Sequence, residues 1–168
     1  DAQKPNRVNK KIELPTTLLE VLTAEKKAKL SGGIYHKVQI ELTYNSNHIE
    51  GSRLTHDQTR YIFETNTIGI DGGAVKVDDI VETANHFKCI DLIIENAKKP
   101  ITETFIKELH RTLKSGTTDA RQDWFAVGDY KRLPNTVGDM FTAQPEEVAE
   151  KMKELLFEYN AKKEKTFD

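Results

Sequence analysis

The sequence predicts an all-α fold, a helical bundle that carries one short β-hairpin. Three observations predict it: apolar residues recur at helical spacing along most of the chain, capping residues precede several of these stretches, and glycine or proline bounds them. The 168 residues are enough for a domain with a hydrophobic core. We find no internal repeat and no low-complexity tract.

Residues 1–33 are predicted to form an N-terminal arm and a short helix, and residues 34–168 the main body. The polar residues 1–13 form the arm, and a helix over 15–30 ends at the turn Ser31-Gly32-Gly33. Thr55 followed by Gln58 is a capping-box pattern, which predicts a helix over 55–64. A longer helix over residues 34–50 comes between them, because side chains recur at helical spacing at Ile34, Val38, Leu42, Asn45 and Ile49.

Three further helices and the hairpin are predicted in the second half of the chain. A helix over 76–97 has Asp78 and Asp79 in its first turn, where the helix dipole favours acidic side chains. Thr102 caps the next helix, and Pro145 begins the last one. Residues 115–134 are expected to be irregular, and the hairpin lies within residues 130–142. The last helix carries an apolar stripe without an obvious partner, formed by Val148, Met152, Leu155, Leu156 and Tyr159.

Composition and charge exclude several classes of protein. A net charge of −2 gives the chain as a whole no electrostatic reason to bind nucleic acid or an anionic membrane. No run of about 18 apolar residues is present, and residues 1–11 lack the apolar segment of a signal peptide. We therefore expect no membrane span and a cytoplasmic location. A single cysteine, Cys89, cannot form an internal disulfide, which fits a reducing compartment.

Simple catalytic motifs are absent from the sequence. The five histidines show no spacing typical of a zinc site, and one cysteine cannot complete such a site. His110 lies near an apolar helix face and is more typical of a histidine satisfied within the core than of a ligand. No G-x-S-x-G, P-loop or G-x-G-x-x-G pattern occurs. Composition and spacing alone therefore indicate only a soluble helical domain, without a recognisable metal site.

The most informative segment is the end of the helix over residues 34–50. Ser46 and Glu50 are four residues apart and share one helical face, and Gly51 is a typical helix stop. A carboxylate on the last turn lies at the negative end of the helix dipole, which disfavours it by roughly 0.3–1 kcal/mol. We therefore expect a cation to be brought to Glu50.

Several segments, in order along the chain, resemble the Fic (Fic/Doc) family. Residues 46–51 match that family's inhibitory pattern [ST]-x-x-x-E-[GN], within a longer similar run over residues 44–55. Residues 106–113, which read Ile-Lys-Glu-Leu-His-Arg-Thr-Leu, are similar to its middle helix. Gly128-Asp129-Tyr130-Lys131 resembles its G-x-[FY]-R step, with Lys131 in place of arginine. Val137-Gly138 and the helix from Pro145 resemble its flap and following helix, so the match covers about residues 35–165.

The resemblance implies an autoinhibited protein adenylyltransferase, which transfers AMP from ATP to a hydroxyl side chain of a target protein. The family's catalytic loop, H-x-F-x-[DE]-G-N-x-R, is absent from this sequence and would fall just beyond Asp168. We therefore expect the chain to be the N-terminal part of a Fic domain, cut before its active centre and inactive alone. ATP and Mg²⁺ are implied as cofactors, with the histidine base, the Mg²⁺ ligand and the phosphate-binding turn in the missing loop.

The resemblance also implies roles for residues of this chain. Glu50 is the candidate inhibitory residue: it would pair with the arginine of the missing loop and keep that arginine from the γ-phosphate of ATP. Ser46 would support the helix or contact nucleotide, and Gly51 would close the helix. The flap over residues 130–142 would receive a segment of the protein substrate as an added strand. Its nucleotide-side candidates are Val137, Gly138, Asp139 and Met140.

Two other interpretations stay open on the sequence. The chain could be a helical regulatory module that donates Glu50 to a partner Fic protein in trans, or a Fic-like scaffold that docks other proteins. The middle-helix and flap matches argue against the first, because such a module needs only the motif helix. We expect the apolar stripe of the last helix either to be exposed or to be covered by a complementing chain or a second copy of this chain.

Overall fold

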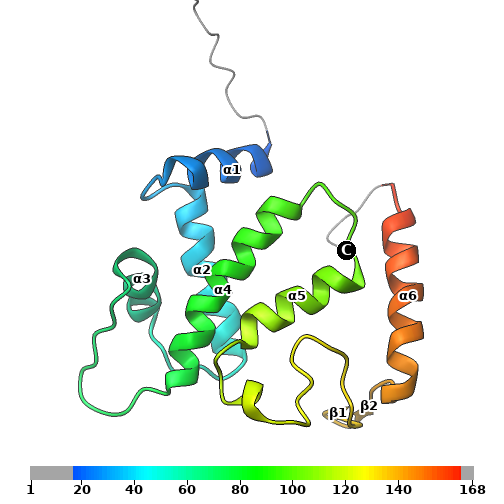
Figure 1. The fold of residues 1–168 in the computed structure, drawn as a ribbon. Coiled ribbons are helices and arrows are strands. Elements are labelled where there is room, and N and C mark those ends of the chain that lie inside the picture. Colours follow the sequence, from blue (N-terminus) through cyan, green and yellow to red (C-terminus); the bar gives the residue numbers. More distant parts are fainter. Residues whose placement is uncertain (1–16, 164–168) are drawn as a thin grey trace, which may run out of the picture.

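The computed structural model describes residues 17–163 and confirms a mostly helical fold (Figure 1). The expected arm over residues 1–13 lies outside the described residues. Within residues 17–163, no helix combines the length and the apolarity that crossing a membrane requires. The elements in this part are α1 (Leu18–Ala28), α2 (Ile34–Ile49), α3 (His56–Thr65), α4 (Val77–Asn96), α5 (Glu103–Lys114), the 3-10 turn η1 (Asp119–Arg121), β1 (Thr136–Val137), β2 (Met140–Phe141) and α6 (Pro145–Ala161).

Helix α4 lies at the centre of the fold and contacts α1, α2, α3 and α5 (Figure 1). Two clusters of buried apolar side chains form on it. One packs Leu22 of α1 against Ile90 and Ile94, and the other packs Ile62 of α3 against Phe87. Because both clusters take central residues from α4, this helix joins the N-terminal helices to the rest of the chain.

Capping residues start the helices where the sequence predicts them. Thr55 Oγ1 accepts the N–H of Gln58 at 3.1 Å, and Gln58 Oε1 accepts the N–H of Thr55 at 2.9 Å, which completes the capping box. Thr102 Oγ1 accepts the N–H of Phe105 at 3.1 Å at the start of α5. Pro145 occupies the first turn of α6.

A carboxylate of α1 caps the first turn of α2. Glu25 Oε2 accepts the backbone N–H of Tyr35 at 2.7 Å, at the helix end where the dipole favours negative charge. Gly33 precedes α2, and a Cβ there would collide with the same carboxylate. Helix α1 ends earlier than the sequence predicts, because Lys29 adopts a left-handed conformation with φ 52°.

A buried row of hydrogen-bonded polar side chains, the polar seam, joins α2 to α4. Its members on α2 are spaced by one helical turn, so they share the face toward α4. The Gln39 amide donates to Asp91 Oδ1 at 2.9 Å, and Thr43 Oγ1 lies 2.9 Å from His86 Nδ1. Gln39 and Thr43 are completely buried. The seam consists of Gln39, Thr43 and Asn47 of α2 with Thr83, His86 and Asp91 of α4.

The apolar stripe that the sequence predicts for α2 is not the face that the helix buries. Ile49 is 82% exposed, and Ile34 and Leu42 are also exposed, whereas Gln39 and Thr43 face α4. Polar side chains can occupy this interface because α4 supplies partners for the Gln39 amide N–H groups, for Thr43 and for Asn47, although Gln39 Oε1 is buried without a hydrogen bond. Hydrophobic periodicity carries no information about such partners, which is why the sequence indicates the wrong face.

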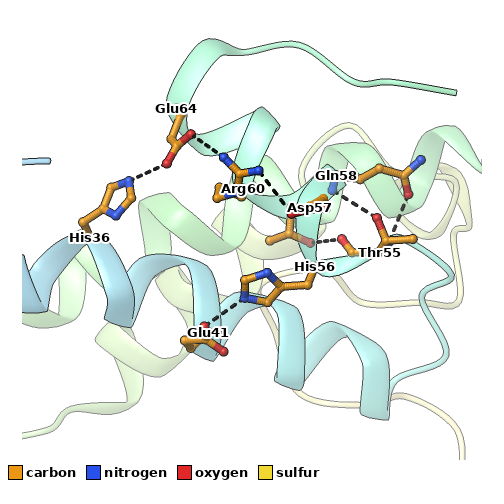
Figure 2. A network of polar contacts seen from close by, with 9 residues as sticks. His36, Glu41, Thr55, His56, Asp57, Gln58, Arg60 and Glu64 are labelled. Atoms are coloured by element: carbon orange, nitrogen blue, oxygen red, sulfur yellow. Dashed lines mark hydrogen bonds and ion pairs between the residues drawn. The ribbon is translucent and has the colours of Figure 1, made fainter. Parts of the chain in front are cut away.

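Helix α3 contacts the outer side of α2 through polar side chains, which Figure 2 shows. His36 Nε2 lies 2.9 Å from Glu64 Oε1, and His56 Nε2 lies 2.9 Å from Glu41 Oε1. Arg60 Nη1 lies 3.2 Å from the other oxygen of the Glu64 carboxylate. Helix α2 is therefore attached to α4 through the buried polar seam and to α3 through the contacts on its outer side.

Helices α5 and α6 form the less buried side of the fold, with α6 at its edge in Figure 1. Neither helix contains a fully buried residue. Asn160 of α6 accepts the backbone N–H of Ile101 at 3.2 Å and donates to the carbonyl of Ile101 at 2.8 Å, which ties α6 to the segment before α5. Leu155 of the predicted α6 stripe is exposed, and its half-buried members are Val148, Met152 and Leu156.

We expect Gln39→Ala to lower the free energy of unfolding by about 1–3 kcal/mol, because it removes a buried donor and leaves its partners on α4 unpaired. Urea unfolding followed by circular dichroism measures this change. The matched control is Gln122→Ala at an exposed position, where the expected change is within about 0.5 kcal/mol. Equal effects of the two substitutions would show that the seam does not contribute to stability.

We also expect stability to rise with pH, because burial lowers the pKa of His86. Between this lowered value and the ordinary histidine value of about 6.5, the unfolded chain binds more protons than the folded chain, so acidification favours unfolding. Urea unfolding at pH values from about 5 to 8 measures the slope. His86→Gln should flatten it, whereas a change at the exposed His48 should not.

Candidate functional site

The end of α2 carries the three predicted motif residues, Ser46, Glu50 and Gly51. The chain leaves the helix through two hydrogen bonds: the Gly51 N–H donates to the His48 carbonyl at 3.1 Å, and the Ser52 N–H donates to the Asn47 carbonyl at 2.9 Å. This is a Schellman motif, in which the residue after the cap needs a positive φ. Gly51 has a φ of 92° and therefore ends the helix where the sequence predicts its end.

Glu50 is the cap residue of α2, and its side chain is exposed. Among residues 17–163, no hydrogen bond or ion pair reaches its carboxylate, although the exposed Arg53 follows only three positions later. The hydroxyl of Ser46, one turn earlier and half-buried, also has no partner in this part of the chain. The carboxylate lies at the helix end where the dipole disfavours it, so a nearby cation would be favourable there.

Helix α4 fixes the position of the motif from both sides. Before Glu50, Asn47 Nδ2 donates to Thr83 Oγ1 at 3.0 Å, which holds the last turn of α2. After Glu50, the backbone N–H of Arg53 donates to Asp79 Oδ2 at 3.1 Å, in the first turn of α4. Glu50 therefore sits between two attachments to the central helix.

Apolar surface lies beside the unpaired carboxylate. Ile49 directly precedes Glu50 and is almost fully exposed, and Leu42 lies two turns earlier along the same predicted stripe. Exposed apolar side chains gathered next to a polar anchor are typical of a contact surface. The end of α2 therefore offers a carboxylate and an apolar stripe together.

Helix α5 holds the irregular segment that leads to the hairpin through a clamp formed by His110, Arg111 and Gly128. His110 Nδ1 accepts the Gly128 N–H at 3.1 Å, and Arg111 Nη2 donates to the Gly128 carbonyl at 3.2 Å. Gly128 has a φ of 73°, and a Cβ there would lie 2.7 Å from Arg111 Nε. Burial and the nearby Lys114 lower the pKa of His110, so its ring stays neutral and Nδ1 can act as an acceptor.

The preceding turns of α5 hold the next residues of the segment. Lys107 Nζ lies 2.8 Å from the Asp129 carboxylate and 4.1 Å from the ring centroid of Tyr130. Its hydrogen bond lowers the pKa of Asp129. The Tyr130 hydroxyl donates to Glu103 Oε1 at 2.6 Å, and burial together with this bond raises the pKa of Tyr130 to about 12. Successive turns of α5 therefore contact successive residues of the segment, which runs antiparallel to the helix.

Lys131 closes the base of the hairpin. Its Nζ donates to Asn135 Oδ1 and to Thr142 Oγ1, both at 2.5 Å, on the two sides of the hairpin. Between these residues the strands are only two residues long, with Thr136 opposite Phe141. The lysine that replaces the arginine of the sequence pattern therefore holds both ends of the hairpin.

The predicted nucleotide-side residues of the flap form the turn of the hairpin: Val137, Gly138, Asp139 and Met140. Met140 is 70% exposed, and Gly138 has a φ of 57°. Within the described residues, α2 and the hairpin share no extensive contact. The same residues contain no cluster of three or more histidine, cysteine or acidic side chains able to hold a metal ion.

Comparison with solved structures shows a resemblance to a Fic domain-containing protein. No protein-family model and no curated protein matches the sequence. The crystal structure of a Fic domain-containing signaling protein from Bacteroides thetaiotaomicron matches with a TM-score of 0.63 and 30% sequence identity. This chain resembles a Fic domain-containing protein in fold and sequence. The match covers 84% of this chain and 55% of that protein, so the chain spans about half the length of its relative.

The match confirms the Fic-like fold that the sequence predicts. The sequence did not reveal how α5 positions the hairpin. The sequence indicated no functional role for His110. Lys107 and Arg111 entered only as members of the run that resembles the Fic middle helix. A usable signal was present, because Glu103, Lys107 and Arg111 recur every four residues along α5. Their partners on residues 128–130 are distant enough in sequence that only the fold reveals them.

We expect Gly128→Ala to destabilise the chain by more than Gly138→Ala. Both glycines have positive φ, which costs a non-glycine residue roughly 1–2 kcal/mol. Only at Gly128 would the new Cβ also collide with Arg111, since nothing lies within 4 Å of the Cβ position at Gly138. Thermal unfolding measures the difference, and hydrogen exchange at residues 128–142 should rise only in Gly128→Ala. A larger loss in Gly138→Ala would contradict the clamp.

Proposed function

We propose that this chain is the regulatory and flap-bearing part of an autoinhibited, cytoplasmic adenylyltransferase of the Fic type. The enzyme transfers AMP from ATP to a hydroxyl side chain of a target protein. The single observation that carries the regulatory part is the exposed Glu50 carboxylate, which has no partner within residues 17–163. The Fic-like match supports the reaction class.

In this proposal Glu50 receives an arginine from the histidine-led loop of the enzyme. A guanidinium meets a carboxylate through two parallel hydrogen bonds, and the pair is strong and strict in geometry. While the arginine is held in this way, it cannot neutralise the γ-phosphate of ATP, so the nucleotide lies in an unproductive position. The loop comes from polypeptide outside these 168 residues, in keeping with the half-length match to the relative.

The attachment of α2 explains how one carboxylate could regulate such a reaction. The polar seam and the Arg53–Asp79 bond fix the helix end on α4, so Glu50 loses little further freedom when it pairs. Ile49 and Leu42 provide an exposed apolar surface on which the polypeptide that carries the arginine can pack. Ser46 supports the same helix end, and Gly51 closes it.

The hairpin is the proposed substrate surface. Its two strands are short and exposed, and their free edges can pair with an extended segment of a target protein. Val137, Gly138, Asp139 and Met140 form its turn and would border the nucleotide. No step of the proposal uses a metal held by the described residues.

The test uses the intact protein and measures incorporation of radiolabelled AMP from ATP. Glu50→Gly and Glu50→Gln should each raise self-modification by roughly tenfold or more, because a charge-assisted pair worth about 1.5–3 kcal/mol is lost. Glu41→Gln removes a carboxylate from the same helix, where it pairs with His56, and should leave the rate unchanged.

Incorporation equal to wild type in both Glu50 variants would refute autoinhibition by this residue. If the intact protein transfers no AMP but lowers the activity of a separate Fic enzyme, the chain acts in trans instead.

A further inference from the structure

A pocket lies beside the base of the hairpin, apart from the motif at the end of α2. Its volume is about 320 Å³, which is at the small end of the range for binding pockets. We call it the hairpin-base pocket. Its main lining residues are His110, Trp124, Phe125, Arg132, Leu133 and Pro134.

Aromatic rings form the inner wall of the hairpin-base pocket. The ring centroids of Trp124 and Phe125 are 5.7 Å apart in an edge-to-face arrangement, and those of His110 and Phe125 are 5.9 Å apart. Trp124 is nevertheless 55% exposed. Leu133, which lies shortly before β1 in the sequence, is also exposed. An exposed tryptophan in an apolar concavity is typical of the anchor points of protein interfaces.

The polar groups at the mouth favour an anion. Arg132 donates from Nη1 to the backbone oxygen of Asp123 at 3.3 Å, and its charge contributes to the lowered pKa of Asp129. Asp129 also lines the pocket and is paired with Lys107, whereas Lys131 bonds only neutral oxygens. Two cationic side chains and one acidic side chain therefore line the pocket, and the acidic one already has Lys107 as a partner, which favours a carboxylate as ligand.

One further donor is available to a ligand. His110 Nδ1 accepts the Gly128 N–H, so the neutral ring carries its proton on Nε2. Within the described residues this N–H has no partner, and it can donate to a carbonyl or a carboxylate in the pocket. Aromatic walls, one neutral donor and a cationic mouth suit a peptide better than a free inorganic anion.

We propose that the hairpin-base pocket binds an extended peptide segment of the target protein, with a phenylalanine-sized side chain inside and an adjacent carboxylate on Arg132. Leu133 and Pro134 lead within two residues into β1, so a segment paired along the hairpin reaches the pocket without a turn. The identity of the segment as substrate rests on the proposed function, whereas binding of the peptide itself does not.

Trp124 is the sole tryptophan of the chain, so its fluorescence reports occupancy of the pocket directly. The probe is the blocked peptide acetyl-Gly-Phe-Asp-Gly-Gly-amide, titrated into the 168-residue chain, with calorimetry as a second measurement. We expect saturable binding that weakens severalfold when glycine replaces the phenylalanine of the peptide or asparagine replaces its aspartate.

The protein variants test the same two contacts. Arg132→Gln should weaken binding about fivefold, the upper range for an exposed ion pair. Arg121→Gln is the matched control, because Arg121 is exposed on η1 nearby but does not line the pocket, and it should change binding by less than twofold. Absence of binding in both measurements overturns the proposal, as does equal binding of the glycine peptide or of Arg132→Gln. None of these results depends on AMP transfer, so the Glu50 experiment stands or fails separately.

Discussion

The buried hydrogen bonds between α2 and α4 are the constraint on which the rest of this structure depends. Gln39 is completely buried and donates to a carboxylate and a carbonyl of α4, so sliding or rotating α2 would leave several buried polar groups unpaired. Apolar contacts tolerate such shifts far better, because they are not directional. The seam therefore fixes the register of α2, and with it the place where Glu50 emerges beside Gly51.

The hairpin depends on a second set of directional contacts, those from α5. His110 and Arg111 hold the two backbone polar groups of Gly128, and Lys107 holds the residue after it. Lys131 then bridges the two sides of the hairpin. A two-stranded hairpin with strands this short has little stability by itself, so its position has to come from such side-chain contacts. The Fic-like fold thus presents two surfaces, the α2 end and the hairpin, each held by polar contacts to a neighbouring helix.

Both surfaces carry exposed groups suited to binding another molecule. At the end of α2 these are a carboxylate without a partner among the described residues and the exposed side chains of Ile49 and Leu42, and beside the hairpin they are an exposed tryptophan and the guanidinium of Arg132. Their separation on the molecule fits a division between regulation at Glu50 and recognition near Arg132.

The sequence by itself determined the helices, their caps and the stop at Gly51, because these depend on neighbours within four or five residues. It also predicted the resemblance to Fic proteins that the structural match confirms. Only the tertiary structure decided that α2 buries its polar face and exposes Ile49, and that α5 clamps Gly128. Each of these outcomes pairs a donor with an acceptor far away along the chain, such as Gln39 with Asp91 or Arg111 with Gly128. Periodicity and capping rules describe one segment at a time, and pairings of this kind exist only once two segments have packed together.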